Sequence, residues 1–269
     1  MIAKLMAPLR AAPATVPCLA AIVLFLVWAG EQAGYPLTHW APGAIGVLAL
    51  LGLSLALLGP PRAAMTRPVL IALACLGAYT GLSFLSIAWA AVPGTAWEGA
   101  DRTLLYLAVF ALFAAWPQRG RTAALLVVVW VLGISALALH ALLHADAAHG
   151  AALQALFPGA RLVYPVGYPN GNAAEWLMAL WPAFLLARSR ELPAALRGLL
   201  AACAVLLAEV ALLSQSRGSL YATPVMLILV FAALPGRVRT FALLVPVAGG
   251  IAAAAPAVLH VGARLTPSG

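Results

Sequence analysis

The chain has 269 residues, of which 65% are hydrophobic and 8% are charged. A soluble globular domain carries about 25% charged residues, so this composition excludes a soluble enzyme and indicates an integral membrane protein. The net charge of +8 is explained by arginines placed around membrane segments and by attraction to anionic lipid headgroups. We therefore expect membrane lipids as partners and no nucleic acid.

Apolar runs long enough to cross a bilayer recur from residue 16 almost to the end of the chain. A membrane-spanning helix needs about 20 mostly apolar residues. Without the alternating pattern of a barrel, a chain inside a membrane satisfies its backbone groups only as helices. The sequence predicts an all-α polytopic bundle, a single transmembrane helical domain over residues 1–269. The nine expected spans are residues 16–34, 42–58, 68–90, 102–116, 122–143, 172–187, 194–213, 219–234 and 240–260.

The basic residues are distributed unevenly between these spans. Short cytoplasmic loops of membrane proteins carry an excess of Lys and Arg. With the N-terminus inside, eleven of the fifteen Lys and Arg residues fall on the cytoplasmic side, and four fall outside: Arg102, Arg161, Arg217 and Arg264. The sequence therefore predicts an N-terminus inside, a C-terminus outside and four arginines that break the charge rule.

A first polar group, Glu98, Asp101 and Arg102, lies where the fourth expected span begins. Charged residues beside an apolar span mark either a functional site or a paired structural contact. Acidic residues are favourable near the positive end of a helix dipole. Helix capping with a local ion pair and ligand binding therefore both remain open for this group.

A second polar group runs from Tyr164 to Asn172 and leads to Glu175. Its prolines and glycines prevent a regular helix. Asn172 is a suitable N-cap with Glu175 at the third helical position, which is a variant of the capping box. Asn170, Asn172 and the N–H groups of a helix start could instead hold a phosphate. Both interpretations remain open.

A third polar group, residues 214–219, joins the seventh and eighth expected spans. Arg217 has a planar fork of donors that suits bidentate binding of phosphate, and Ser216 adds a further donor. A lipid-phosphate or diphosphate site and an ordinary polar turn are both open here. Glu209 lies about two turns before Arg217 on what we expect to be the same helix. It is a candidate catalytic base or a structural carboxylate, and no catalytic residue is assigned.

A possible metal site is formed by His144, Asp146 and His149, which fall in an expected outside loop. These residue types ligate zinc, but an exposed polar loop is the simpler interpretation. The sequence contains no nucleotide-binding loop, zinc-protease motif or serine hydrolase pattern. We expect neither a metal nor a cofactor.

The second and third groups together resemble a known family. Residues 168–174, an apolar helix containing Pro182, an arginine-rich inside loop and then residues 214–218 are similar to the O-antigen ligase and O-antigen polymerase family. Residues 82–89, together with Arg102, look like an earlier outside segment of that family. The resemblance covers most of the chain from about residue 80.

The resemblance implies a GT-C-type glycosyltransferase of the bacterial plasma (inner) membrane that works in cell-envelope polysaccharide assembly. Such enzymes transfer a glycan from a polyprenyl-diphosphate carrier to a glycan or lipid-linked acceptor outside the membrane, without a nucleotide sugar and generally without a metal. Arg217 matches the arginine of the family's Ser-Arg-Gly motif, and Arg264 is similar to another basic position. The residues implied to bind the carrier diphosphate are Arg217, Arg264, Arg102, Ser216, Asn170 and Asn172.

Members of this family continue into a large outside loop that carries a proposed histidine base. We therefore expect this sequence, which ends at Gly269, to be the front part of a longer architecture. Two other classes remain open. One is a secondary transporter or flippase for a lipid-linked or small solute, and the other is a non-catalytic relative or scaffold that binds the carrier lipid.

Overall fold

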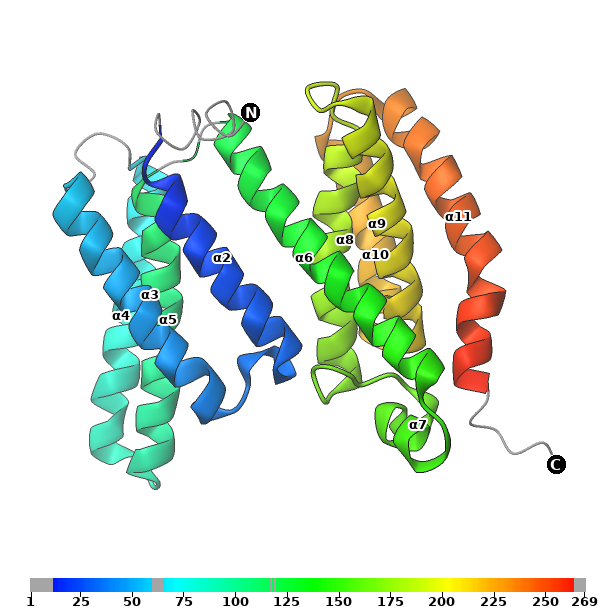
Figure 1. Ribbon diagram of the computed structural model, residues 1–269. Coiled ribbons are helices and arrows are strands. Elements are labelled where there is room, and N and C mark those ends of the chain that lie inside the picture. The colour runs from blue at the N-terminus through cyan, green and yellow to red at the C-terminus, as the bar shows by residue number, and fades with distance from the viewer. Residues whose placement is uncertain (1–11, 60–64, 117, 119, 264–269) are drawn as a thin grey trace. The chain divides into compact units, whose positions relative to one another are not determined.

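The computed structural model describes residues 12–59, 65–116, 118 and 120–263, and the regular elements of this part of the chain are all helices. The predicted all-α class is confirmed. The chain divides into two compact units, whose helices are labelled in Figure 1. Unit 1 comprises Met1–Phe25 and Pro36–Leu126, and unit 2 comprises Leu26–Tyr35 and Val127–Gly269. The single transmembrane domain stays a prediction.

Unit 1 is built around the helix α5 (Pro93–Ala115), which packs against α3 (Leu37–Leu58) and α4 (Arg67–Ser86). The buried positions Ala108, Leu112 and Ala115 recur every three or four residues, so one face of α5 is covered by its neighbours. The unit also contains η2 (Ile87–Trp89), the part of α2 (Thr15–Gly30) up to Phe25 and the first turns of α6 (Gly120–Ala147).

Unit 2 is built around α8 (Pro169–Ala187) and α9 (Ala194–Leu213), which run antiparallel and form its most extensive contact. Buried alanines recur on both helices, and small residues let helix backbones approach closely in a membrane protein. α10 packs on α8, and α11 packs on α9. The other elements are η1 (Gln32–Gly34), most of α6, α7 (Gly150–Leu156), η3 (Pro158–Ala160), α10 (Arg217–Ala233) and α11 (Arg237–Ala263).

Several helices have the length and composition of membrane spans. In the described chain, five helices are both long enough and apolar enough to cross a membrane: Leu37–Leu58, Arg67–Trp89, Gly120–Ala147, Ala194–Leu213 and Arg237–His260. Thr15–Gly30 and Arg217–Ala233 are shorter apolar helices. Large apolar side chains such as Leu57, Ile71 and Ile228 are exposed, as lipid-facing residues are in a membrane protein. The chain therefore has the character of a membrane protein, whereas the nine spans and their orientation stay predictions.

Several helices begin earlier than the sequence predicted, and the starts of α5, α8 and α10 bear on the polar groups. α5 begins at Pro93 and α8 at Pro169, because proline suits the first turn of a helix, where no N–H partner is needed. Asn172 is consequently not the N-cap of α8. That position is Tyr168, whose backbone oxygen accepts a hydrogen bond from Asn172 N. α10 begins at Arg217, where an expected span was to begin only at residue 219.

The earlier start of α5 places Glu98 and Arg102 inside the helix, and no acidic residue lies in its first turn. The capping interpretation of the first polar group is therefore wrong, whereas its local ion pair is confirmed. The prediction that His144 and Asp146 lie in a loop is also wrong, because α6 continues to Ala147 and contains both residues. Among the described residues, no group of three His, Cys, Asp or Glu side chains is placed to hold a metal.

Candidate functional site

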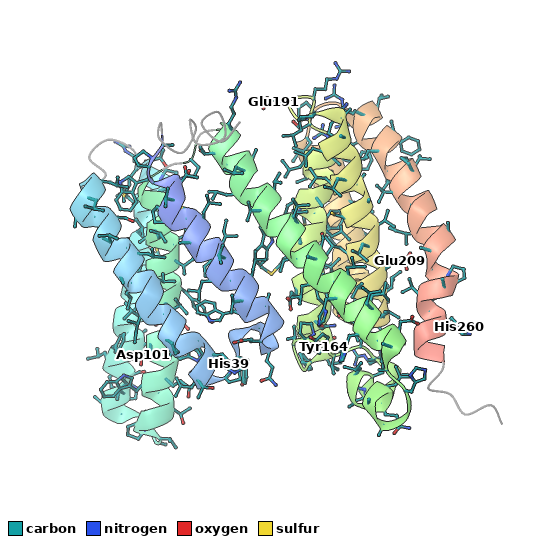
Figure 2. The ribbon with its side chains drawn as sticks, in the orientation of Figure 1. His39, Asp101, Tyr164, Glu191, Glu209 and His260 are labelled. Carbon is teal, nitrogen blue, oxygen red and sulfur yellow. The ribbon has the colours of Figure 1, made fainter. Side chains whose placement is uncertain are left out.

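The second and third polar groups of the sequence meet at one end of unit 2, the end at which Figure 2 labels Tyr164. The loop between η3 and α8 lies beside the turn between α9 and α10. Leu162 N donates to the backbone oxygen of Leu213 over 2.9 Å, and this bond joins the loop to the end of α9. Residues far apart in the sequence are thereby held on one surface.

The junction between this loop and this turn is held together on its buried side by Asn172. Its side chain is fully buried, and Nδ2 donates to Leu162 O over 3.3 Å and to Ser214 Oγ over 3.0 Å. Ser214 is fully buried as well. A buried amide that bridges two segments holds them in register, because breaking either bond leaves a polar group unpaired. Asn172 thus has a positioning role and does not present its amide donor to a ligand.

Arg161 holds the same junction together on its more exposed side. Its Nε donates to Ser214 O over 3.3 Å, and its Nη2 donates to Asn170 Oδ1 over 3.1 Å. Asn170 Nδ2 in turn donates to the Tyr168 hydroxyl over 2.8 Å. Sequence reasoning did not include Arg161 among the site residues, although its predicted outside position against the charge rule was a signal. Asn170 is exposed and lies at the predicted site.

Arg217 differs from Arg161 in having no partner. Its side chain is exposed, and within the described chain the guanidinium makes no hydrogen bond, ion pair or ring contact. It is the first residue of α10, and Ser216 caps this helix by accepting from Ser219 N over 3.3 Å. The unpaired donors therefore lie beside the positive end of a helix dipole, where an anion is stabilised.

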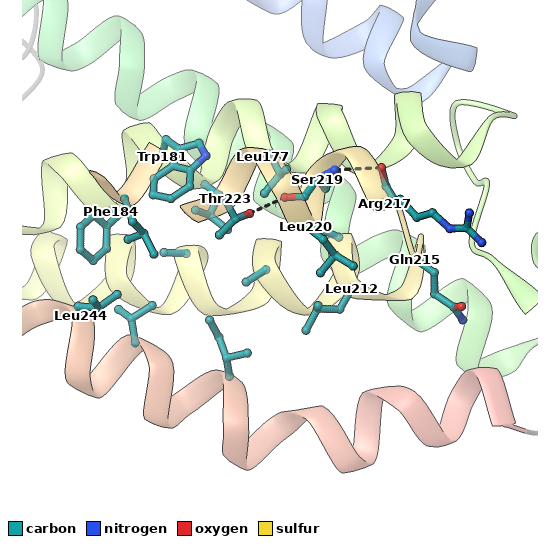
Figure 3. Close-up of a pocket in the computed structure, with 18 residues that line it drawn as sticks. Leu177, Trp181, Phe184, Leu212, Gln215, Arg217, Ser219, Leu220, Thr223 and Leu244 are labelled. Atoms are coloured by element: carbon teal, nitrogen blue, oxygen red, sulfur yellow. Dashed lines mark hydrogen bonds between the residues drawn. The ribbon is translucent and has the colours of Figure 1, made fainter. Parts of the chain in front are cut away.

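A cavity of about 630 Å³ lies between α8, α9, α10 and α11, and Arg217 is at one end of it (Figure 3). Most of its lining is apolar and includes Leu177, Trp181, Phe184 and Leu220. Gln215, Ser216 and Arg217 contribute its polar end. The sequence did not predict this cavity. Its lining suits a ligand that combines an apolar part with an anionic head.

The candidate base Glu209 lies elsewhere. It is on α9, which ends at Leu213, so the prediction that it shares a helix with Arg217 is wrong. It is buried, neither carboxylate oxygen has a hydrogen-bond partner among the described residues, and it is not one of the residues that line the cavity. Glu175 on α8 is buried and unpartnered in the same way.

Two further predicted site residues lie outside this cluster. Arg102 belongs to unit 1, where its Nη2 bonds Glu98 Oε1 over 2.8 Å and its guanidinium lies 5.1 Å from the ring centroid of Trp40. Arg264 lies outside the described residues. The predicted site residues that the structure brings together in unit 2 are therefore Asn170, Asn172, Ser216 and Arg217.

The fold and the site define an all-helical membrane protein with an apolar cavity and an unpaired arginine at its polar end. No family model matches the chain, and neither a curated protein nor a solved structure matches it.

Proposed function

We propose that this protein is a multi-pass glycosyltransferase of the O-antigen ligase type, which transfers a glycan from a polyprenyl-diphosphate carrier to a glycan or lipid-linked acceptor. The observation that supports this most is Arg217, unpaired at the end of an apolar cavity of about 630 Å³. A polyprenyl diphosphate has the two matching parts, an apolar chain and a strongly anionic head. The sequence resemblance named above supports the same reaction.

In this proposal the carrier chain occupies the apolar lining, and the diphosphate lies at the polar end. Glycan transfer breaks the bond between the anomeric carbon and a phosphate oxygen, so negative charge develops on the leaving diphosphate. A guanidinium aimed at that charge stabilises it, and its fork geometry binds two oxygens at once. The acceptor hydroxyl forms the new bond and gives its proton to a base that is not assigned.

The proposed topology supports the same arrangement. Nine spans with the N-terminus inside put Arg161 and Arg217 on the outer side of a bacterial plasma membrane, together with Arg102 and Arg264. Arg161 already bonds Ser214 and Asn170, so its role is to hold the loop. Arg217 is left to contact the diphosphate.

Binding of the carrier head tests the proposal directly. Purified protein in neutral detergent is titrated with undecaprenyl diphosphate, undecaprenol and inorganic diphosphate. A hydrogen bond to a charged group contributes about 1.5–3 kcal/mol. Arg217→Gln is therefore expected to weaken undecaprenyl diphosphate binding by about 10-fold or more, and Arg217→Lys by less. The control is Arg121→Gln, which removes another exposed arginine. Equal weakening by both Gln variants, or equally tight binding of undecaprenol, contradicts the proposal.

Binding of the carrier chain is tested by filling the cavity. Ala208 lines it, so Ala208→Trp is expected to weaken binding of undecaprenyl diphosphate and to leave binding of inorganic diphosphate unchanged. The matched control is Ala222→Trp, because Ala222 is exposed on α10 and does not line the cavity. If the two tryptophan variants bind the carrier equally well, the chain does not use this cavity.

A second candidate is a carrier-lipid-binding protein without transferase activity. One observation favours it: Glu209, the candidate base, does not line the cavity. Labelled glycan on the carrier distinguishes the two functions, because only a transferase moves the label to an acceptor. A secondary transporter or flippase would instead move the intact carrier across a proteoliposome membrane.

A further inference from the structure

Five arginines gather at the end of unit 2 opposite Arg217, the end at which Figure 2 labels Glu191. They come from the connection between α8 and α9 and from the first turns of α9 and α11. Figure 1 shows this connection and the connection between α10 and α11 at the same end of these helices. Glu191 is the one acidic residue in the sequence stretches 188–197 and 234–240. The arginine cluster consists of Arg188, Arg190, Arg197, Arg237 and Arg239.

The two connections are bonded to each other. Arg188 Nη2 donates to the backbone oxygen of Pro235, and a Cβ placed on Gly236 would lie 3.5 Å from the same nitrogen. Gly236 has a φ of +80°, a conformation that glycine adopts without strain. Arg237 Nε donates to Phe231 O over 3.1 Å. The cluster is therefore a preformed surface made of two connections.

Several donors of this surface are buried without an acceptor. Arg188 Nε, Arg197 Nε and the Thr240 hydroxyl have no hydrogen-bond partner among the described residues, and Thr240 is 1% exposed. The ion pair between Glu98 and Arg102 is in unit 1, and no described carboxylate forms an ion pair with an arginine of the cluster. A buried donor without a partner is destabilising, so these donors favour a ligand with several anionic oxygens.

Exposed apolar side chains lie close in sequence to the arginines of the cluster on α9 and α11. Val238 and Phe241 on α11 are 84% and 59% exposed, and Leu199 on α9 is also exposed. These residues lie within the first turns of helices that are long and apolar enough to cross a membrane. The first turns of α9 and α11 also bring two positive helix-dipole ends to this surface. A ligand that touches both parts needs an anionic head and apolar chains.

We infer that the arginine cluster binds the phosphate head of an anionic phospholipid, with the acyl chains against Leu199, Val238 and Phe241. Basic pockets between membrane helices bind such heads, and a guanidinium can bond two phosphate oxygens at once. The site is distinct from the cavity at Arg217. The inference does not depend on glycan transfer or on a polyprenyl carrier.

The experiment uses the full chain, purified in neutral detergent and stripped of lipid. Phosphatidylglycerol, phosphatidylcholine and free glycerol phosphate are titrated separately, and binding is followed by native mass spectrometry. We expect phosphatidylglycerol to bind more tightly than the other two. Comparable binding of phosphatidylcholine overturns a site for anionic heads. Equally tight binding of glycerol phosphate shows a free-phosphate site and overturns the lipid assignment.

Variants separate a built site from general charge attraction. The double variant Arg188→Gln, Arg197→Gln is expected to weaken phosphatidylglycerol binding about 100-fold, since each of the two lost charged hydrogen bonds weakens it about 10-fold. The matched control is Arg67→Gln, Arg121→Gln, which removes the same charge from exposed arginines outside the cluster. Equal weakening by both pairs overturns the inference.

Folding is controlled separately, because Arg188 also bonds Pro235 O. Arg190→Gln, Arg239→Gln changes two exposed members of the cluster and leaves that bond intact. Thr240→Val removes a hydroxyl without changing the charge. Both variants are expected to keep the melting temperature within a few degrees and to weaken phosphatidylglycerol binding several-fold. Unchanged binding in both overturns the inference even if the Arg188 variant does not fold.

Discussion

Replacing Asn172 tests whether the buried amide holds the two polar segments together. The Asn172→Ala substitution removes the Nδ2 bonds to Leu162 O and Ser214 Oγ and leaves both partners buried. Hydrogen bonds between membrane helices contribute about 0.6 kcal/mol on average, and hydrogen bonds in soluble proteins about 1 kcal/mol. Two such bonds give a loss of about 1–2 kcal/mol in the free energy of unfolding.

The loss is partly offset inside the same side chain. Asn172 Oδ1 is buried and has no partner among the described residues, so its removal relieves the cost of that unpaired acceptor. We therefore expect a net loss at the low end of this range, about 1 kcal/mol, which corresponds to a factor of about 5 in the folding equilibrium constant. The assay is unfolding in mixed micelles of increasing dodecyl sulfate fraction, followed by tryptophan fluorescence.

The control is Asn170→Ala on the same helical turn. Asn170 is exposed, and its partners are the Arg161 guanidinium and the Tyr168 hydroxyl. Exposed bonds of this kind are replaced by bonds to water, so we expect a change below about 0.5 kcal/mol. Equal losses in the two variants, or no loss in Asn172→Ala, refute the reasoning that burial makes Asn172 the bridge of this junction.

Two other predictions concern packing and topology. A Cβ on Gly250 would lie 3.0 Å from Val205 Cγ2, whereas a Cβ on Gly249 would meet nothing within 4 Å. In the same micelle assay, Gly250→Ala is therefore expected to lower the free energy of unfolding by about 1 kcal/mol. Gly249→Ala is expected to raise it by about 0.5 kcal/mol. With the native cysteines replaced by alanine, His149→Cys and Glu191→Cys, both at exposed positions, are expected to react from opposite sides of a sealed vesicle with a membrane-impermeant maleimide. Labelling of both from one side contradicts the predicted topology.

The helices could be predicted from the sequence because apolar runs are a local property. The residues at which the helices begin were harder to predict. Pro93 and Pro169 start α5 and α8, whereas the polarity of the residues that follow suggested that the spans begin later. For α8 this error hid the role of Asn172, which is a buried bridge and not a helix cap.

The different roles of Arg161 and Arg217 could not be predicted. Both break the charge rule in the same way, and nothing adjacent in the sequence distinguishes them. The difference comes from tertiary contacts, because Arg161 meets Ser214 O and Asn170, whereas Arg217 meets no partner in the described chain. The arginine cluster is a similar case, since its arginines were expected on the cytoplasmic side but their bonded arrangement depends on how α8 and α10 pack.

In the proposed function, carrier binding and glycan transfer need different groups, and the cavity supplies only the groups that binding needs. Anchoring an amphipathic anion needs an apolar lining and an unpaired cation, and α8–α11 provide both in a single unit. Transfer to a hydroxyl also needs a base within hydrogen-bond reach of the acceptor, and the candidate carboxylate Glu209 does not line the cavity. A Glu209→Gln variant that binds the carrier normally and still transfers glycan would show that the base is another residue. Loss of transfer with unchanged binding and stability would instead require the helix α9 to present Glu209 to the acceptor during the reaction.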